Sequence, residues 1–396
     1  MNKIIQSAEP YTSIKVSSLR SGDELLEGIL SSDRELFPRK IDRPVVLYGA
    51  GSLGKMAKNF FDYLHMPYLY VVDKNAAQYK KDKYWQGVNI IHPSEVKETD
   101  KTNCLLVICI VTIPLIALRD QLRDDGWGDV AFFYDVSEFY SNRYPINNGW
   151  FLNKINENEK KAIGKVYSSF ADDTSRLYYL QFLAWRKLRI ELLFESLEVN
   201  NDNRFFIPEV VSVLHGDEVF VDCGAHWGFV MEKFVKVVEH RYKALYAIEP
   251  DSNNVKMLEE RLKNISSIKI LKCALGDVNG EGKFYQGFDY ASKLSENGGD
   301  LVKITTLDRM NIPATFIKLH LEGGDLKALK GAVNTIREYR PIIAVTIYHN
   351  ADGVWETPYF LMSNTRNYKY YLRLHSWGGT GAVLYAIPKE RKNAYE

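Results

Sequence analysis

Residues 217–251 contain two short apolar runs, and each run ends in an acidic side chain. The first run ends at Asp222 and is followed by Gly224 and Gly228, and the second ends at Glu249. A glycine turn after one strand and an acid after the next are the parts that hold a ribose-bearing cofactor, because the acid accepts hydrogen bonds from ribose hydroxyls. The pattern predicts a cofactor site at the carboxyl ends of two neighbouring strands.

The spacing of these glycines favours one class of cofactor. A loop that binds pyrophosphate has the pattern Gly-x-Gly-x-x-Gly, whereas Ala-His-Trp separates Gly224 from Gly228 here. S-adenosylmethionine has no pyrophosphate, so its loop needs only a tight turn that presents backbone N–H groups and Asp222 to the methionine end. We therefore predict S-adenosylmethionine as the cofactor and methyl transfer as the chemistry.

The residues expected to contact this cofactor lie in three segments. They are Asp222, Gly224, Ala225, His226, Gly228, Glu249, Pro250, Ala274 and Leu275. The last two follow a third apolar run and are expected at the carboxyl edge of the sheet, beside an adenine. Two interpretations of His226 stay open: it contacts the methionine end or the acceptor, or it is a turn histidine satisfied by backbone.

A fourth expected strand, 315–320, leads into an unusual set of polar side chains. Lys318, His320 and Glu322 alternate with apolar residues, so a period of two puts them on one face. Such groups are costly in a central strand unless they line a cleft or pair with one another. Methyl transfer to a hydroxyl requires removal of its proton, and a histidine that titrates near neutrality suits that role. We predict His320 as the general base; the alternative is a Lys318–Glu322 ion pair with His320 hydrogen-bonded in the core.

His349 follows the fifth expected strand, again at the carboxyl edge. We predict that His320, Glu322 and His349 line the reacting end of the site as its catalytic residues. Two imidazoles and one carboxylate also form a set that binds divalent metals, but the three residues lack the spacing of a metal motif, and no metal ligand is assigned. His349 otherwise contacts the acceptor or serves as an alternative base.

A second glycine motif occurs nearer the N-terminus. Gly49, Gly51 and Gly54 form a full Gly-x-Gly-x-x-Gly after an apolar run, and Asp73 ends the next run. Alone, this pattern suggests a dinucleotide. The alternative function is therefore an NAD(P)-dependent oxidoreductase, or a protein that binds a nucleotide or nucleotide-sugar at these four residues.

The composition of the 396-residue chain excludes several classes of protein. Its 51 basic and 50 acidic residues leave a formal charge of +1, which gives no footprint for nucleic acid. The four cysteines show neither zinc spacing nor a disulfide framework. The longest apolar run, 104–118, is shorter than the roughly 20 residues of a membrane span. We expect a cytoplasmic protein that acts on a small-molecule or glycan substrate, whereas the oligomeric state is not readable.

Alternating strands and helices predict an α/β fold in both halves of the chain. We expect an N-terminal extension over 1–40, a Rossmann-like domain with a parallel sheet over 41–145, a helical connector over 146–204 and the cofactor-binding domain over 205–396. Strands of the last domain are expected at 219–222, 244–249, 268–272, 315–320, 342–347, 368–374 and 382–387. The last two are too close for an intervening helix and should pair antiparallel. An inserted pair, 283–286 with 302–306, is expected to add a flap.

From about residue 205 to 388 the sequence resembles the FkbM-type S-adenosylmethionine-dependent methyltransferases. The matching segments are 221–225, 248–251, 274–277, 306–308, 317–318 with 322–323, and 347–349. The sequence departs from the family at His320, where the family pattern has aspartate, and at His226 and Trp227, where asparagine and an aliphatic residue are more frequent. The resemblance implies a class I, seven-stranded methyltransferase fold and methylation of an acceptor, usually a hydroxyl, on sugars, glycans or polyketide-type products.

The segment 41–145 resembles the nucleotide-sugar-associated Rossmann-like domains that precede some FkbM-type catalytic domains. Together the two resemblances imply an O-methyltransferase of carbohydrate biosynthesis that acts on a sugar, a glycan precursor or a related metabolite. A further alternative stays open, in which His320 marks a methyltransferase fold that has lost catalysis and acts as a binding module.

Overall fold

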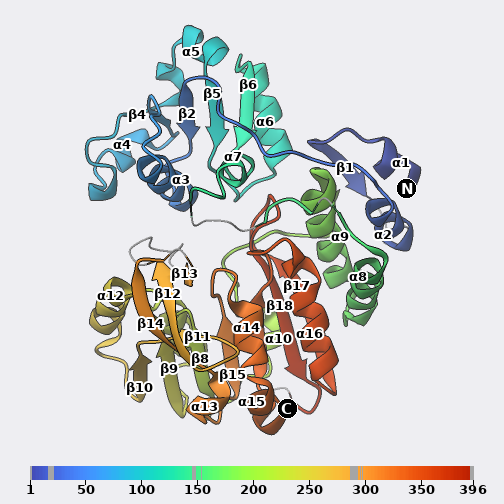
Figure 1. Cartoon of the computed structure of the whole chain (residues 1–396), viewed down its shortest axis with the longest axis vertical. Coiled ribbons are helices and arrows are strands. Elements are labelled where there is room, and N and C mark those ends of the chain that lie inside the picture. Colours follow the sequence, from blue (N-terminus) through green and yellow to red (C-terminus); the bar gives the residue numbers. More distant parts are fainter. Residues whose placement is uncertain are drawn as a thin grey trace. The chain divides into compact units, whose positions relative to one another are not determined.

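The computed structural model describes residues 2–16, 22–144, 149–152, 154–285, 293–294, 296 and 298–392 (Figure 1). The chain divides into two compact units, each built from separate stretches of sequence. The first unit contains Met1–Lys154, Leu180–Ser196 and Ser376–Thr380, and the second contains Ile155–Tyr179, Leu197–His375 and Gly381–Glu396.

The first unit is built around a five-stranded parallel sheet. Its strands are β2 (Val45–Tyr48), β3 (Val71–Val72), β4 (Ile90–Ile91), β5 (Leu105–Ile108) and β6 (Asp129–Phe132), in the order β4-β3-β2-β5-β6. All residues of β2 and β5 are buried, as expected for parallel strands covered on both faces. The α-helices between them are α3 (Ser52–Tyr63), α4 (Ala76–Tyr79), α5 (Glu98–Asn103) and α6 (Leu115–Asp124), and α7 (Phe133–Phe139) follows β6.

A small two-stranded sheet also belongs to the first unit. Strand β1 (Thr12–Val16) pairs in parallel with β7 (Ile190–Phe194), far away in the sequence. Helices α1 (Asn2–Ser7) and α2 (Gly22–Leu30) flank β1 along the chain. The segment 1–40, predicted only as an N-terminal extension, therefore contains a strand that pairs with a strand from the middle of the chain.

Two longer helices lie between the two large sheets in the sequence. Helix α8 (Glu157–Ser169) begins at a capping box made by Asn156 and Glu159, and α9 (Asp173–Leu188) follows. The two units share α9, since 173–179 belongs to the second unit and 180–188 to the first. The boundaries 146–204 for a separate helical connector stay a prediction.

The second unit contains a seven-stranded sheet. Its strands are β8 (Val219–Cys223), β9 (Ala244–Ile248), β10 (Ile268–Leu271), β15 (Phe316–Leu319), β16 (Ile342–Thr346), β17 (Tyr368–Leu374) and β18 (Ala382–Pro388). They lie in the order β10-β9-β8-β15-β16-β18-β17. The first five are parallel, and β18 runs antiparallel to both of its neighbours. The predicted α/β fold class, with the class I methyltransferase sheet and its antiparallel hairpin, is confirmed.

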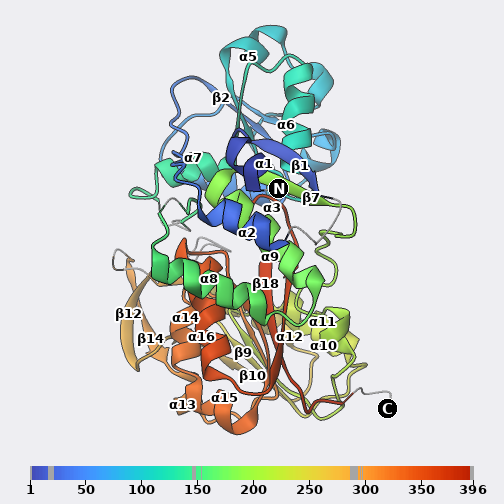
Figure 2. The ribbon, with the colours of Figure 1, turned by 90° about the vertical axis from the view of Figure 1, so that its right-hand side faces the viewer.

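Helices cover both faces of this sheet. Figure 2 shows α11 (Phe229–Val237) and α12 (Ser252–Leu262) on one side and α14 (Asp325–Lys330) and α16 (Glu356–Asn364) on the other. On the α11 side, the core contains the rings of Phe220, Phe234 and Phe316. The ring of Phe220 lies 4.3 Å from that of Phe234 and 4.9 Å from that of Phe316. Short helices α10 (Pro208–Val211), α13 (Leu307–Met310) and α15 (Val333–Tyr339) complete the unit.

A four-stranded sheet is inserted between β10 and β15. It consists of β11 (Ala274–Leu275), β12 (Gly280–Tyr285), β13 (Lys293–Leu294) and β14 (Asp300–Thr305). Strands β12 and β14 pair antiparallel, which confirms the predicted flap pair, although Gln286 lies outside the described residues.

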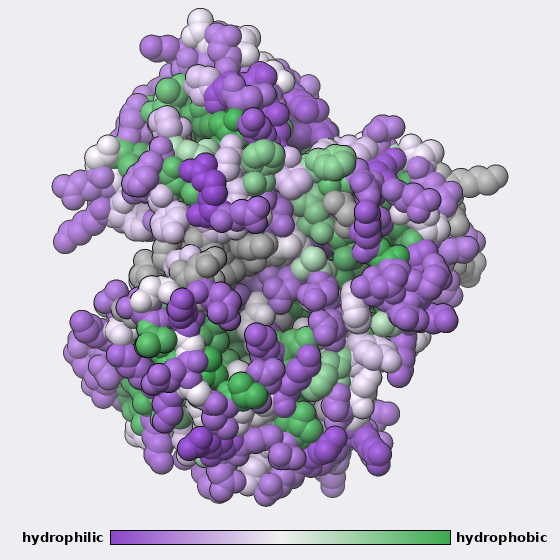
Figure 3. Space-filling model, in the orientation of Figure 1, coloured by the Kyte–Doolittle hydropathy of each residue, from purple (hydrophilic) through white to green (hydrophobic). Residues whose placement is uncertain are grey.

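The molecular surface is mixed in polarity. Figure 3 shows hydrophilic residues over most of the face in view, with smaller groups of hydrophobic ones. Among the described residues, no helix is both long and apolar enough to cross a membrane.

Candidate active site

A cavity opens at the carboxyl ends of β8, β9 and β15 in the second unit, and the space not filled by atoms there is about 1110 Å³, including the part that is open to solvent. Ligands of open α/β sheets bind at this edge. The lining residues are Gly224, His226, Ile248, Glu249, Pro250, Asn254, Cys273, Ala274, Leu275, Phe284, Leu294, His320, Leu321, Glu322, Gly323, Gly324, Lys327 and Asn350. The cavity therefore brings together side chains from most of the segments that the sequence singled out.

The turn after β8 requires glycine at position 224. Gly224 has φ +77, and a Cβ atom there would lie 2.1 Å from the carbonyl oxygen of His320. The backbone N–H groups of Gly224 and Ala225 both donate to the carbonyl oxygen of Ile248, at 3.0 Å each. The missing side chain thus lets the end of β8 approach the ends of β9 and β15, which closes one wall of the cavity.

Glu249 is held by hydrogen bonds at the end of β9. Its Oε2 accepts from the backbone N–H of His226 at 2.9 Å, and its Oε1 accepts from the backbone N–H of Asp251 at 3.0 Å and from Nδ2 of Asn254 at 3.4 Å. Burial raises the pKa of Glu249, while hydrogen bonds from Asp251 and His226 act in the opposite direction. The carboxylate is therefore fixed in position between the glycine turn and the start of α12.

Opposite parts of the cavity wall differ in polarity. One part is apolar and includes Ala274, Leu275, Phe284 and Leu294 from the inserted sheet. The other includes His320 and Glu322, which follow β15. A ligand with an apolar ring at one end and a reacting polar group at the other would match this division.

Asp222 acts inside the protein rather than at the cavity wall. It is fully buried, and its Oδ1 accepts a hydrogen bond of 2.8 Å from Nζ of Lys318. The same ammonium group donates to the carbonyl oxygen of Gly224 at 2.8 Å. Burial raises the pKa of Asp222, and its ion pair with Lys318 lowers it in part. This pair therefore ties the glycine turn to β15, so Asp222 is a positioning residue in this arrangement.

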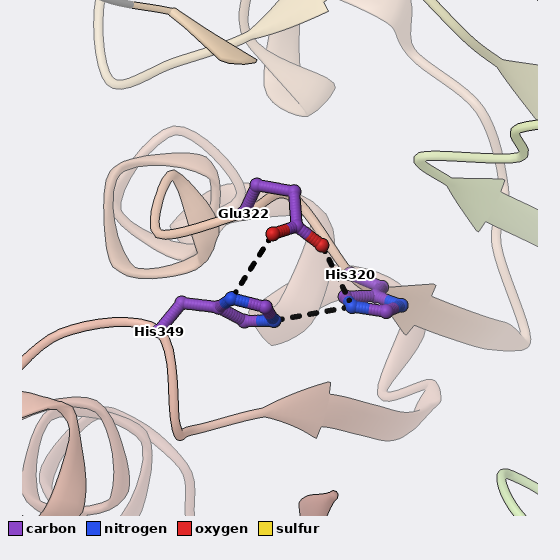
Figure 4. A group of neighbouring side chains, drawn as sticks. All are labelled: His320, Glu322 and His349. Atoms are coloured by element: carbon purple, nitrogen blue, oxygen red, sulfur yellow. Dashed lines mark hydrogen bonds and ion pairs between the residues drawn. The ribbon is translucent and has the colours of Figure 1, made fainter. Parts of the chain in front are cut away.

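His320, Glu322 and His349 form a compact cluster (Figure 4). Nε2 of His320 lies 3.1 Å from Oε1 of Glu322, and Nδ1 of His349 lies 3.1 Å from Oε2 of the same carboxylate. The Nε2 atoms of the two histidines are 3.1 Å apart. The predicted convergence of these three side chains is thus present in the structure, although only His320 and Glu322 of the three border the cavity.

The cluster combines a neutral imidazole with an ionised carboxylate at neutral pH. Burial lowers the pKa of His320 to about 3, and the hydrogen bond with Glu322 raises it only in part. Burial opposes ionisation of Glu322, but the adjacent His349 and His320 hold its pKa below the usual range. The near-neutral titration that sequence reasoning assumed for His320 differs from this result, because the sequence does not show how deeply the ring is buried.

Two further predicted cofactor residues, Ala225 and Gly228, do not line the cavity. Gly228 has φ +86 at the start of α11, where a Cβ atom would lie 2.9 Å from Leu258. The wall also contains residues that sequence reasoning did not select, among them Cys273, Phe284, Leu294, Lys327 and Asn350. Phe284 lies in the predicted flap pair and Leu294 in β13, but no local sequence signal shows that these residues border the cavity.

The glycine turn of the first unit is packed by its own side chains. A Cβ atom at Gly49 would lie 2.7 Å from Ile110, and one at Gly54 would lie 2.1 Å from the carbonyl oxygen of Gly49. Oδ2 of Asp73 accepts from the backbone N–H of Ala50 at 2.7 Å. At Gly51, the added atom would meet only Tyr79 Oη, at 3.8 Å. Two of the three glycines are therefore explained by packing within the unit.

Comparison with solved structures shows the same fold elsewhere. A methyltransferase FkbM from Methylobacillus flagellatus KT matches with 20% identity and a TM-score of 0.64, over 93% of this chain and 98% of that chain. An rRNA methylase from Streptococcus thermophilus has a TM-score of 0.30 at 15% identity, over 45% of this chain and 90% of that chain. A putative methyltransferase from Streptococcus mutans, solved with SAH, has a TM-score of 0.30 at 11% identity, over 46% and 97%. At such low identity, the first of these matches shows the fold.

The family comparison is more specific. No curated protein sequence matches the chain. Residues 222–372 match the family model of the methyltransferase FkbM domain, and this match supports S-adenosylmethionine as the cofactor. The resemblance of the N-terminal half to nucleotide-sugar-associated domains stays a prediction. The resemblance to FkbM-type methyltransferases that the sequence predicted is confirmed for residues 222–372.

Proposed function

We propose that this chain is an S-adenosylmethionine-dependent methyltransferase that methylates a hydroxyl group of a sugar, a glycan precursor or a related metabolite. One observation carries the proposal: the cavity between the glycine turn and Glu249 lies wholly within the segment that matches the FkbM domain. The match to the FkbM family model and the geometry of the cavity therefore support the same residues as the site.

The residues around the cavity fit S-adenosylmethionine. A carboxylate has about four acceptor positions, and Glu249 has three protein donors, so capacity remains for a ribose hydroxyl. The apolar wall formed by Leu275, Phe284 and Leu294 suits an adenine ring. The turn at Gly224 provides close approach of backbone at the methionine end.

His320 and Glu322 are placed to act on the acceptor. S-adenosylmethionine supplies a methyl group on a positively charged sulfur, and the electrons of the broken carbon–sulfur bond return to that sulfur. Burial lowers the pKa of His320 to about 3, so its imidazole is neutral but weakly basic. It can accept the proton of an acceptor hydroxyl because the carboxylate of Glu322, 3.1 Å away, stabilises the imidazolium that results. The acceptor oxygen then carries the methyl group, and all charges balance.

The exposed side of the cavity favours a hydroxyl-rich acceptor. Lys327 and Asn350 both line it, and Nδ2 of Asn350 donates to the carbonyl oxygen of Gly323 at 3.0 Å. Amide and ammonium groups of this kind hydrogen-bond hydroxyl and oxyanion groups. A sugar or glycan precursor has such groups in abundance.

Methyl transfer from isotopically labelled S-adenosylmethionine tests the proposal directly. The full chain is incubated with a panel of sugars, nucleotide-sugars and glycosides, and labelled product is measured together with S-adenosylhomocysteine. We expect equal amounts of both with at least one acceptor, and His320→Ala should lower turnover far more than cofactor affinity. Cofactor binding without transfer to any acceptor would favour the binding-module alternative, and absence of cofactor binding would remove the proposal.

A further inference from the structure

The cluster of His320, Glu322 and His349 has the composition of a metal site. One donor atom from each of the three side chains can be chosen so that all three atoms lie within 4.8 Å of one another. Figure 4 shows both rings turned toward the carboxylate. Glu322 and His320 border the cavity, and His349 is buried behind them.

Hydrogen bonds alone account poorly for this arrangement. Nε2 of His320 has three polar neighbours, namely Nε2 of His349 and Oε1 of Glu322 at 3.1 Å and Oη of Tyr348 at 3.2 Å. An imidazole nitrogen carries one proton or one lone pair, so it makes one full hydrogen bond at a time. Nδ1 of His349 lies 3.1 Å from Oε2 of Glu322, as a metal-bound imidazole places its other nitrogen beside a carboxylate, so Nε2 is the atom of this ring that is left for an ion shared with His320.

The distances fit donors that share one ion. Nitrogen–metal bonds are about 2.0–2.1 Å long for zinc, so two nitrogens on one octahedral or tetrahedral ion lie roughly 2.8–3.4 Å apart. The two Nε2 atoms are 3.1 Å apart, and so are Nε2 of His320 and Oε1 of Glu322. A cation at this place would also remove the conflict between the neighbours of Nε2, because each donor would direct its lone pair at the ion.

We propose that His320, Glu322 and His349 bind one divalent transition-metal ion at the wall of the cavity. Two imidazoles and a carboxylate suit zinc, manganese, iron, cobalt or nickel better than magnesium or calcium, which prefer oxygen donors. Three protein ligands leave coordination positions open. Because His320 and Glu322 border the cavity, an ion held by them would lie within reach of a molecule bound there.

The ion would change how the acceptor loses its proton, and this part of the inference rests on the proposed function. A hydroxyl bound to a divalent ion is more acidic than a free one. With an ion bound, the proton of such a hydroxyl would leave to water in the open cavity, its oxygen would take the methyl group, and the carbon–sulfur electron pair would return to sulfur. His320 and Glu322 would then hold the ion, and His320 would not serve as the base.

Metal titration of the full chain tests the inference. After treatment with a chelator and its removal, the protein is titrated with Zn²⁺ and with Co²⁺, by calorimetry and by visible absorption. We expect one ion per chain, with Mg²⁺ far weaker. His349→Ala and Glu322→Gln should each weaken binding by at least about 100-fold, since loss of a residue that only supports a metal ligand already costs about 10- to 100-fold.

A matched control separates this site from other histidines. His240 is exposed and lies outside the cluster, so His240→Asn should bind the ion as the wild type does. Wild-type protein that binds Zn²⁺ and Co²⁺ no more tightly than His349→Ala would overturn the inference, and this comparison does not depend on how well the cavity variants work as enzymes.

Parallel titration with S-adenosylhomocysteine distinguishes failure of the metal site from failure of the proposed function. Cofactor binding and methyl transfer that survive complete removal of metal would reject a role of the ion in the reaction and leave the function standing. Ion binding without cofactor binding would support the metal site and reject the methyltransferase. Activity that is lost with the chelator and restored by Zn²⁺ or Co²⁺ would support both.

Discussion

The two units of this chain contain the same local arrangement of strand, glycine turn and acid in different surroundings. In each unit, a buried parallel strand ends in a glycine turn, and an acid at the end of the next strand accepts a backbone N–H from that turn. Asp73 accepts from Ala50 at 2.7 Å in the first unit, and Glu249 accepts from His226 at 2.9 Å in the second. This arrangement is therefore a property of the βαβ unit and does not by itself identify a ligand.

The surroundings of the two turns differ in what faces the acid. Glu249 borders a cavity with an apolar wall and a polar one. Around the first turn, Ile110 packs on Gly49, and Nε1 of Trp85 donates to the carbonyl oxygen of Ala50 at 3.1 Å. The glycine motif therefore predicts the turn, whereas side chains from elsewhere in the sequence determine whether a ligand can bind beside it.

The largest effect is expected from a methyl group at the second turn. Gly224→Ala would place Cβ 2.1 Å from a backbone oxygen at a positive φ, and strain plus displacement should cost at least about 3 kcal/mol. We expect a lower melting temperature and loss of S-adenosylhomocysteine binding, measured by thermal unfolding and calorimetry.

Gly51→Ala is the matched change in the first turn. Its Cβ would meet only Tyr79 Oη, at 3.8 Å, so stability should change by less than about 1 kcal/mol and cofactor affinity should stay the same. Equal effects of the two substitutions would show that the comparison between the turns is mistaken.

An intermediate loss of stability is expected at low pH, and it should affect the second unit. Burial lowers the pKa of His375 to about 4, while the unfolded chain binds this proton below about pH 6.5. Between these values the unfolded state holds more protons, so stability falls as pH falls, by at most about 3 kcal/mol for this group. Urea unfolding at pH 7 and pH 4.5 should show the loss.

Two variants assign that loss to its source. His375→Gln should reduce the dependence of stability on pH between about 4 and 6.5, and the buried His320, whose pKa is lowered to about 3, should account for part of the slope that remains. His65 of the first unit is exposed, and His65→Asn should leave the dependence as it is in the wild type. A slope that His375→Gln does not reduce would point to other buried groups.

The smallest effect separates the two acids. Glu249→Ala should weaken S-adenosylhomocysteine binding by about 1–3 kcal/mol, which is the scale of losing hydrogen bonds to a charged group. Asp73→Ala should leave that binding unchanged, since Asp73 belongs to the first unit. Calorimetry on both variants measures the difference in affinity for S-adenosylhomocysteine. Weaker binding by Asp73→Ala would show that the cofactor binds at the glycine turn of the first unit instead.

The sheet of the second unit was predictable because each strand carries its own apolar run. The expected strands 368–374 and 382–387 agree closely with β17 and β18, since a hairpin is specified by nearby residues. Strands β1 and β7 were missed, because Thr12 pairs with Ile190 across most of the first unit's sequence and neither run shows its partner.

The site was predictable where strand ends define it and not where the fold brings in distant segments. Gly224, Glu249 and His320 follow strands, so their meeting at one edge follows from parallel topology. Phe284 and Leu294 reach the cavity through the inserted sheet, and the low pKa of His320 results from burial. Both depend on tertiary packing, which spacing does not encode.

A structure of the full chain with S-adenosylhomocysteine would show whether the cofactor lies beside Glu249. We expect ribose hydroxyls within hydrogen-bonding distance of Glu249, adenine beside Leu275 and Phe284, and sulfur directed toward His320. A ligand bound at the turn of Gly49, or a cavity beside Glu249 that stays free of ligand in crystals saturated with it, would disprove this binding site.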